Sequence, residues 1–188
     1  MRANLWLIRH GETEWSLSGA HTGRTDLPLT AKGEQQAEAL RSKLAGHPFS
    51  LVLTSPLQRA RRTCELADLG AAAQIEPNLR EWDYGDYEGK SSEDIQRTRP
   101  GWSLFRDGVP NGETVQQVGE RAQAVIERAL WEAQGDVALF AHGHILRILA
   151  ACWVGLPPEG GGYFALGTAS VSILSYEHES RVIQHWNT

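Results

Sequence analysis

The chain has 188 residues, of which 41% are hydrophobic and 22% are charged, values typical of a soluble globular protein with one packed core. Its 18 Lys and Arg stand against 23 Asp and Glu, and this net charge of −5 disfavours a dedicated nucleic-acid binder, which needs a basic face. The apolar stretches fall well short of the ~20 residues that cross a bilayer, and the short apolar run after Asn4 is no signal-peptide core. We therefore expect a single domain over residues 1–188, a cytoplasmic location, and neither a membrane nor a nucleic-acid partner.

Two cysteines, Cys64 and Cys152, lie far apart in the sequence without metal-ligand spacing. This usage fits buried thiols in a reducing compartment better than a disulfide framework. We expect neither thiol to be a nucleophile.

Strand-like and helix-like segments alternate along the chain, beginning with a strand over residues 5–8. Thr30 can cap a helix that ends before Gly46, and a second strand covers residues 51–54. Ser55 then opens a capping-box pattern with proline at the first helical position, which predicts a helix that begins there. The buried face of that helix is expected to carry Leu57, Ala60, Cys64 and Ala67.

The second half of the chain continues the alternation. Thr114 opens a longer helix that ends at Gly135, and its buried side is expected to carry Val115, Val118, Ala122, Val125, Ala129 and Ala133. A strand over 137–141, a helix over 145–153, a loop over 155–162 and strands over 171–176 and 182–186 follow. This order predicts an α/β fold, a three-layer αβα sandwich around a mostly parallel sheet.

Reactive side chains follow three of the expected strands directly. Arg9 and His10 come after the first strand, and Ser55 and Arg59 come after the second. The third strand is followed by His142, Gly143 and His144. Ligands of open α/β sheets bind outside the carboxyl ends of the strands, so these residues are expected to meet at one sheet edge. Guanidinium forks bind phosphoryl oxygens, neutral imidazole is a feasible nucleophile, and helix N-termini add N–H donors. The sequence therefore predicts a phosphoryl-transfer site.

Phosphoryl transfer needs a proton for the leaving oxygen, and residues 81–89 mix carboxylates with aromatic side chains. A carboxyl group beside apolar rings has a raised pKa and can act as a general acid. The sequence leaves four candidates open, namely Glu81, Asp83, Asp86 and Glu88.

These motifs, in this order, resemble the signature of the histidine phosphatase superfamily, the phosphoglycerate mutase-like proteins. Residues 7–13 are similar to its first histidine motif and residues 54–60 to its second arginine motif. Residues 111–114 are similar to its helix-opening motif and residues 141–143 to its second histidine motif. The resemblance covers nearly the whole chain and implies a phosphoglycerate mutase-like fold.

The resemblance also implies a role for each matching residue. It makes His10 the phosphorylated nucleophile and Glu81 the proton donor, which later helps water attack the phosphohistidine. It makes Arg9, Arg59 and His142 the phosphate clamp, with no metal and no cofactor. The expected substrate contacts are Ser16, Thr22, Gly23 and Gly143.

Residues 22–30, 81–85 and 142–144 resemble the branch of broad-range acid phosphatases and sedoheptulose bisphosphatases. Many family members carry asparagine where this chain has Ser16, whose shorter side chain offers one donor. The chain is also short of the insertions with which mutases retain a bisphosphorylated intermediate. We therefore expect a metal-independent phosphomonoester hydrolase that acts on small phosphorylated metabolites; the branch resemblance suggests a homodimer.

Two other functions stay open, a cofactor-dependent phosphoglycerate mutase and a non-catalytic phosphate-binding module. A zinc site at His142 and His144 is disfavoured because a third ligand is missing and the arginines would repel a cation. His144 is open between a substrate contact and a helix cap, and His21 is a candidate substrate contact. The aromatic residues Trp82, Tyr84, Trp102 and Phe105 are open between pocket wall and core. Surface or structural positions are expected for Arg61, Arg62, His47, His178 and His185.

Overall fold

The computed structural model describes residues 2–188, which are built around a six-stranded sheet in the order β3-β2-β4-β1-β5-β6. The strands are β1 (Leu5–Arg9), β2 (Leu51–Thr54), β3 (Ala73–Ile75), β4 (Val137–Ala141), β5 (Val171–Glu177) and β6 (Ser180–His185). Strands β3, β2, β4 and β1 are parallel, whereas β5 and β6 form an antiparallel hairpin that continues the sheet beyond β1. The predicted α/β fold with a mostly parallel sheet is confirmed.

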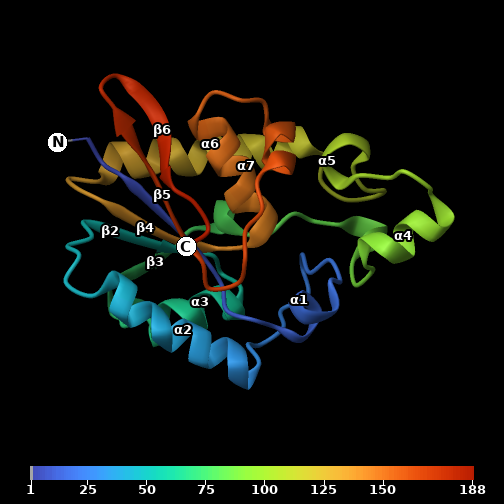
Figure 1. Cartoon of the computed structure of the whole chain (residues 1–188), viewed down its shortest axis with the longest axis horizontal. Helices are drawn as coiled ribbons and strands as arrows, with labels where there is room; N and C mark the ends of the chain where they lie inside the picture. Colours follow the sequence, from blue (N-terminus) through green and yellow to red (C-terminus); the bar gives the residue numbers. More distant parts are fainter. Residues whose placement is uncertain (1) are drawn as a thin grey trace.

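Helices cover both faces of this sheet (Figure 1). On one face lie α2 (Ala31–Leu44) and α3 (Gln58–Leu66), and on the other α6 (Val115–Glu132) and α7 (Gly143–Trp153). Successive strand residues point to opposite faces. Accordingly Ile8 and Phe140 pack with α2 and α3, whereas Leu7 and Leu139 pack with α6 and α7. The result is the expected three-layer sandwich, with apolar packing on each side of the sheet.

The capping patterns predict two helix starts correctly and one incorrectly. Thr30 and Thr114 cap α2 and α6, each accepting a backbone N–H three residues further on. The start predicted at Ser55 is wrong, because α3 begins at Gln58. Leu57, expected on the buried face of this helix, precedes the helix and is only half-buried.

A contact distant in sequence explains the later start of α3. The Ser55 hydroxyl lies 2.8 Å from Nε2 of His142. The carboxylate of Asp26, from a different segment, accepts the first helical N–H, that of Gln58, at 2.8 Å. The helix is therefore capped from another part of the chain.

Other boundaries differ by smaller amounts. Helix α7 begins at Gly143, before the predicted start at residue 145, so His144 lies inside the helix and does not cap it. The predicted loop over 155–162 contains a 3₁₀ turn, Pro158–Tyr163. Strand β3 and three short helices are additional to the elements expected from the sequence, namely α1 (Glu14–Ser18), α4 (Ser92–Thr98) and α5 (Leu104–Asp107). Three short 3₁₀ turns complete the description, Gly70–Ala72, Pro77–Leu79 and Gly85–Tyr87.

The connections that leave β1 and β4 run to opposite faces of the sheet, since β1 leads towards α2 and β4 into α7. Such a switch point leaves a crevice outside the carboxyl ends of the strands, where ligands bind. The rings of His10 and His142, which follow these two strands, have centroids 5.1 Å apart. The expected meeting of the strand-end motifs is therefore observed.

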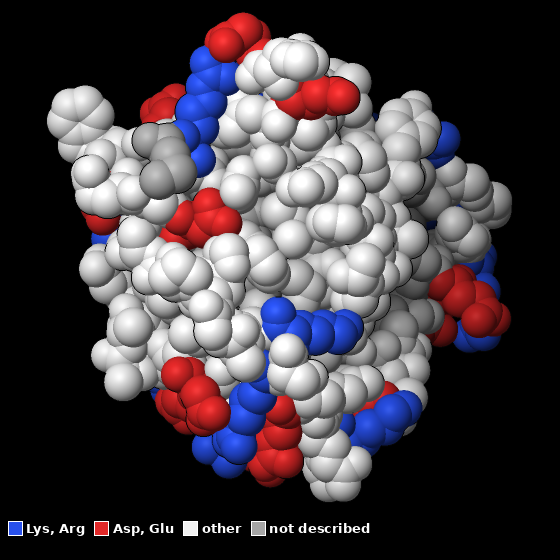
Figure 2. All heavy atoms as spheres, turned by 60° about the vertical axis from the view of Figure 1, so that its left-hand side comes forward, with Lys and Arg blue, Asp and Glu red and all other residues white. Residues whose placement is uncertain are grey.

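Surface charge is mixed on the face shown in Figure 2, where Lys and Arg side chains lie among Asp and Glu side chains. Within residues 2–188, no helix has both the length and the apolar character needed to span a bilayer. The cytoplasmic location stays a prediction.

Both cysteine thiols are free, and Cys64 is buried. Burial raises the pKa of the Cys64 thiol to about 12 and also raises the pKa of Cys152. Nucleophilic reaction needs the thiolate, and a raised pKa disfavours that form near neutral pH.

Candidate active site

A cavity of about 190 Å³ lies at the carboxyl ends of β1 and β4. Six of the residues expected from the sequence line it, namely Arg9, His10, Ser16, Thr22, Glu81 and Gly143. The other three, Gly23, Arg59 and His142, are buried and are not part of the lining.

His10 is held with one ring nitrogen directed into the cavity. Its Nδ1 lies 2.7 Å from the carbonyl oxygen of Gly11, and a carbonyl only accepts, so Nδ1 carries the proton. Nε2 makes no hydrogen bond with the described residues and opens on the cavity. Burial, together with the charges of Arg9 and Arg59, holds the pKa of His10 well below its ordinary value. The ring is therefore neutral, with a lone pair on Nε2.

The backbone around His10 is positioned by a close approach between two glycines. A Cβ on Gly11 would lie 2.3 Å from the carbonyl oxygen of Gly33, and one on Gly33 would lie 2.1 Å from the carbonyl oxygen of Glu12. No side chain fits at such distances. The first turn of α2 thus packs directly on the segment that supplies the carbonyl partner of His10.

Arg9, the last residue of β1, reaches the cavity with an unused donor. Its Nη1 donates to the carbonyl of Leu166. Within residues 2–188, its Nε is the one buried side-chain nitrogen or oxygen without a hydrogen-bond partner. Leaving a buried donor unsatisfied costs about 1–3 kcal/mol, which an incoming anion would relieve. Gly143 lies beside this guanidinium and begins α7, whose dipole adds a positive end to the cavity.

Arg59 is fully buried behind the cavity, and its guanidinium holds the loop that contains Thr22. It donates from Nη2 to the carbonyl of Thr22 and from Nη1 to that of Thr25, both at 3.0 Å. Its Nε donates to Nδ1 of His142 at 3.1 Å. In this structure the donors of Arg59 thus face the protein.

His142 is a neutral ring between Arg59 and Ser55. Because Nδ1 accepts from Arg59, its proton is on Nε2, which donates to the Ser55 hydroxyl. Burial, assisted by the charge of Arg59, holds the pKa of His142 well below its ordinary value. Among residues 2–188, no three His, Cys, Asp or Glu side chains are grouped as metal ligands.

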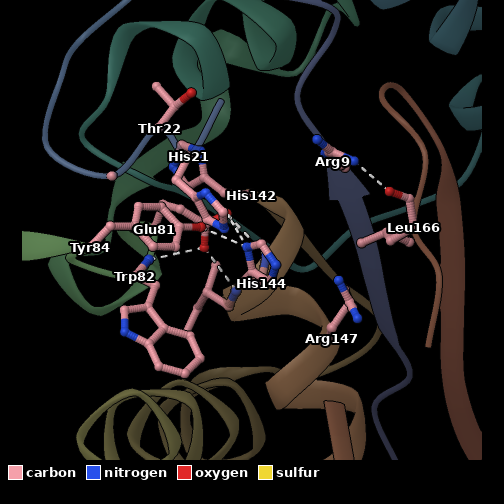
Figure 3. Close-up of polar contacts among 12 residues, drawn as sticks. Arg9, His21, Thr22, Glu81, Trp82, Tyr84, His142, His144, Arg147 and Leu166 are labelled. Carbon is pink, nitrogen blue, oxygen red and sulfur yellow. Dashed lines mark hydrogen bonds and ion pairs between the residues drawn. The ribbon is translucent and has the colours of Figure 1, made fainter. Parts of the chain in front are cut away.

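Of the four candidate carboxyl groups, the structure brings only Glu81 to the cavity. Its carboxylate accepts the N–H groups of Trp82, His144 and Ile145, each at 3.0 Å, and so lies at the N-terminus of α7 (Figure 3). The other three carboxylates hold neighbouring segments: Glu88 accepts from Gly23 and Thr25, Asp83 pairs with Arg24, and Asp86 accepts from Asn111.

The expected substrate contacts differ in what they can offer. Ser16 lines the cavity, but its hydroxyl accepts the N–H of Thr13 at 2.8 Å in the capping box of α1 and donates to the carbonyl of Thr13 at 2.9 Å. The Thr22 hydroxyl donates to Ala20 at 3.2 Å. The N–H of Gly23 donates to Glu88 at 2.9 Å, and this glycine is buried in the loop whose carbonyl groups accept from Arg59.

The structure also places the residues that the sequence left open. His21, Tyr84 and His144 line the cavity. Three aromatic side chains pack in the core instead, Trp82, Trp102 and Phe105. His47 bonds to Asp136 at the other end of β1, and the exposed residues are Arg61, Arg62, His178 and His185.

The model of the histidine phosphatase superfamily (branch 1) matches residues 5–188. The chain belongs to this superfamily. An acid phosphatase of Mycobacterium tuberculosis is 41% identical over an alignment of 181 residues that covers 94% of this chain and 88% of that protein. A sedoheptulose 1,7-bisphosphatase of Saccharomyces cerevisiae is 39% identical over an alignment of 182 residues, gaps included, that covers 80% of this chain and 67% of that protein.

A solved structure of the Mycobacterium tuberculosis protein Rv3214 matches this histidine phosphatase with a TM-score of 0.93 at 37% identity, covering 100% of this chain and 98% of that one. A protein named probable phosphoglycerate mutase, of Salmonella arizonae, is 31% identical over 97% of this chain and 89% of that protein. The family, the fold and the phosphatase class inferred from the motifs are confirmed.

Six residues that the sequence patterns did not indicate also line the cavity of this histidine phosphatase, namely Trp15, Gly19, Ala20, Ser92, Arg147 and Leu166. Arg147 lies four residues after Gly143 on α7. Residues at this spacing share one face of a helix, so the sequence could have predicted that Arg147 lies near Gly143. Leu166 lies in a loop, where no periodic pattern marks a residue that approaches a strand end.

Proposed function

We propose that this histidine phosphatase hydrolyses small phosphorylated metabolites through a phosphohistidine on Nε2 of His10, without a metal ion, and that residues 1–188 act as one domain. One observation carries the proposal. The Nδ1–H of His10 is held by the Gly11 carbonyl, which leaves the Nε2 lone pair facing a cavity that Arg9 also lines.

In the first half-reaction, Nε2 of His10 attacks phosphorus and the bond to the ester oxygen breaks. Glu81 gives its proton to the leaving oxygen, and the alcohol departs. Arg9 and the N-terminus of α7 offset the charge on the equatorial oxygens.

In the second half-reaction, water attacks the phosphohistidine and the bond from phosphorus to Nε2 breaks. The Glu81 carboxylate takes a proton from the attacking water, and inorganic phosphate leaves. We assign Arg59 and His142 to the phosphate clamp as well, and their donors would turn from Thr22, Thr25 and Ser55 to the phosphoryl group when it binds. The proposed substrate contacts are Ser16, Thr22, Gly23 and Gly143.

The test is phosphate release from a panel of small phosphomonoesters, with and without EDTA. We expect chelator-resistant release by the wild-type protein, an alkali-stable phosphoenzyme on rapid quenching, and loss of both in His10→Ala. The matched control is His185→Ala, which removes an exposed histidine from β6. Full activity in His10→Ala would overturn the proposal.

A second candidate is the return of the phosphoryl group to the substrate, which is favoured by the similarity to a probable phosphoglycerate mutase. Conversion of 3-phosphoglycerate to 2-phosphoglycerate faster than phosphate release would establish it, and no conversion would exclude it. Calorimetry that shows phosphate-ester binding without turnover would instead indicate a binding module.

A further inference from the structure

Two imidazole rings with no part in the attack at phosphorus line the same cavity as His10. They belong to His21 and His144, and they lie nearly parallel, with centroids 6.1 Å apart and planes 13° apart. Figure 3 shows His21 on the side of Glu81 and Tyr84, and His144 between Glu81 and Arg147. Because the backbone N–H of His144 donates to Glu81, the acid of the proposed mechanism, the pair lies near the position proposed for the leaving group.

Tyr84 determines which nitrogen of His144 carries the proton. The phenol oxygen lies 2.6 Å from Nδ1 of His144. Burial raises the pKa of Tyr84 well above its ordinary value and lowers the pKa of His144 well below its own, so both groups are neutral. A phenol oxygen donates more readily than it accepts, and we assign the short contact as the Tyr84 O–H donating to Nδ1. The single ring proton of His144 is consequently on Nε2, which has no hydrogen-bond partner among the described residues and is not closed off from the cavity.

His21 has the opposite arrangement. Its Nδ1 lies 2.6 Å from the carbonyl oxygen of Lys90, which only accepts, so the proton is on Nδ1. Burial lowers the pKa of this ring and keeps it neutral, which leaves an accepting lone pair on Nε2. Edge contacts with Tyr84 and Trp102, at centroid distances of 4.7 Å and 5.8 Å, keep the ring in this orientation.

The cavity thus presents one imidazole donor beside one imidazole acceptor. A hydroxyl group can donate and accept, whereas a carboxylate only accepts and would meet the lone pair of His21. The backbone N–H of His144 also donates to the Glu81 carboxylate at 3.0 Å, so the pair stands next to the acid of the proposed mechanism.

We infer that Nε2 of His21 and Nε2 of His144 bind hydroxyl groups on the carbons that follow the esterified carbon, and that the enzyme selects polyol and sugar phosphates over phosphorylated carboxylic acids. This inference deepens the proposed function and rests on it. Arg147 also lines the cavity, and its positive charge would favour a substrate carboxylate and so oppose this preference. Its Nε already donates to Gly161 at 3.0 Å, and its guanidinium lies over the Phe105 ring.

The test compares glycerol 3-phosphate with propyl phosphate, which share a primary leaving oxygen and differ in hydroxyl groups. We expect the wild-type kcat/KM to favour the glycerol ester by about tenfold or more, because the site leaves polar atoms unpaired with propyl phosphate. In His21→Phe and in His144→Phe, which keep a ring but lose its nitrogens, this ratio should fall towards one.

Tyr84→Phe is the second line of the test, since it keeps the ring packing and removes only the O–H that orients His144. Its ratio should fall as well, with a thermal unfolding curve close to that of the wild-type protein. The control His185→Phe should keep the wild-type ratio, because it changes an exposed histidine on β6.

Two results would overturn the inference while leaving the phosphatase proposal intact. One is a wild-type ratio near one, or a ratio that stays unchanged in the His21, His144 and Tyr84 variants. The other is a wild-type preference for 3-phosphoglycerate over glycerol 3-phosphate. Absence of phosphate release from every ester, activated aryl phosphates included, would overturn the proposed function and this inference with it.

Discussion

Arg59 and His142 stand 83 positions apart in the chain and are joined by a 3.1 Å hydrogen bond from Nε to Nδ1. The bond determines the proton position on the imidazole and thereby directs its Nε2–H to Ser55. Because the same guanidinium holds the carbonyls of Thr22 and Thr25, it connects the end of β4 with the loop that precedes α2. The shape of the cavity therefore depends on a buried cation that does not itself line it.

Replacing that cation tests how much the loop depends on it. Arg59→Lys has fewer donors and lacks the planar fork, so we expect the free energy of unfolding to fall by about 2–4 kcal/mol. We also expect kcat/KM to fall by about tenfold or more, since the loop with Thr22 loses its support. Urea unfolding and steady-state kinetics measure both. Arg61→Lys, at an exposed position of α3, is the control, and equal effects of the two changes would contradict the prediction.

The role of Glu81 predicts a dependence on the leaving group. Glu81→Gln should slow alkyl phosphates by about 10²–10⁴-fold but activated aryl phosphates much less, because an aryl oxide leaves without full protonation. Kinetics with a series of leaving groups measures the difference. Asp86→Asn, which changes a carboxylate outside the cavity, should show no such divergence. Equal slowing of both ester types would remove Glu81 from the acid role.

Three buried histidines and the half-buried His144 predict a loss of stability in mild acid. Burial lowers the pKa of His10, His21, His142 and His144 in the folded protein. Their stabilising contribution is thus complete above the unfolded value of about 6.5 and is lost as the pH falls below it, because the unfolded chain then binds more protons. Each ring contributes at most about 1.4 kcal/mol per pH unit.

Urea unfolding between pH 5 and pH 8 checks this pH dependence. We expect the free energy of unfolding to fall steeply below pH 6.5, and His185→Gln, at an exposed position, to keep that slope. A profile that is flat from pH 6.5 to pH 5 would show that these rings accept protons in the folded state.

Because α2 packs on the His10 segment, we expect a Gly→Ala change in this helix to lower the free energy of unfolding, where such a change normally raises it. A Gly→Ala change inside a helix normally stabilises by about 0.5–1 kcal/mol. At Gly33 the added Cβ would lie 2.1 Å from a backbone oxygen, so we expect a loss of about 2 kcal/mol or more and lower activity. At Gly135 an added Cβ would lie 3.6 Å from its nearest neighbour, the Cβ of Ser50, so we expect Gly135→Ala to leave the free energy of unfolding and the activity nearly unchanged. A stabilised Gly33→Ala protein, measured by urea unfolding, would contradict the model of close backbone contact.

A carboxylate at the opposite end of the sheet predicts an effect on stability without one on catalysis. Asp136 accepts hydrogen bonds from Asn4, Trp6 and His47 at 2.9–3.3 Å. Although burial acts to raise its pKa, these bonds outweigh burial and lower it. We expect Asp136→Ala to reduce the free energy of unfolding by about 1–3 kcal/mol with kcat/KM unchanged. Glu38→Ala, at an exposed position of α2, is the stability control.

Much of this fold is readable from the sequence, because its signals are local. Periodic apolar residues mark α2 and α6, and the hydroxyls of Thr30 and Thr114 act within three residues of themselves. The placement of Arg9 and His10 after a strand is equally local. Parallel strands end at one edge of the sheet, so the position of reactive residues directly after three strands implies that these residues meet there.

Other features depend on residues that only the tertiary structure brings together. Of the four candidate carboxyl groups, Glu81 lines the cavity because it approaches the N-terminus of α7, 63 positions away at His144. The start of α3 depends on Asp26, and the proton positions on His21 and His144 depend on Lys90 and Tyr84. A hydrogen bond needs its two atoms within about 3 Å, and no local pattern of residues encodes such a meeting between distant segments. The sequence by itself therefore determined the order of the elements and the kind of chemistry, and the tertiary structure decided the partner of each polar atom.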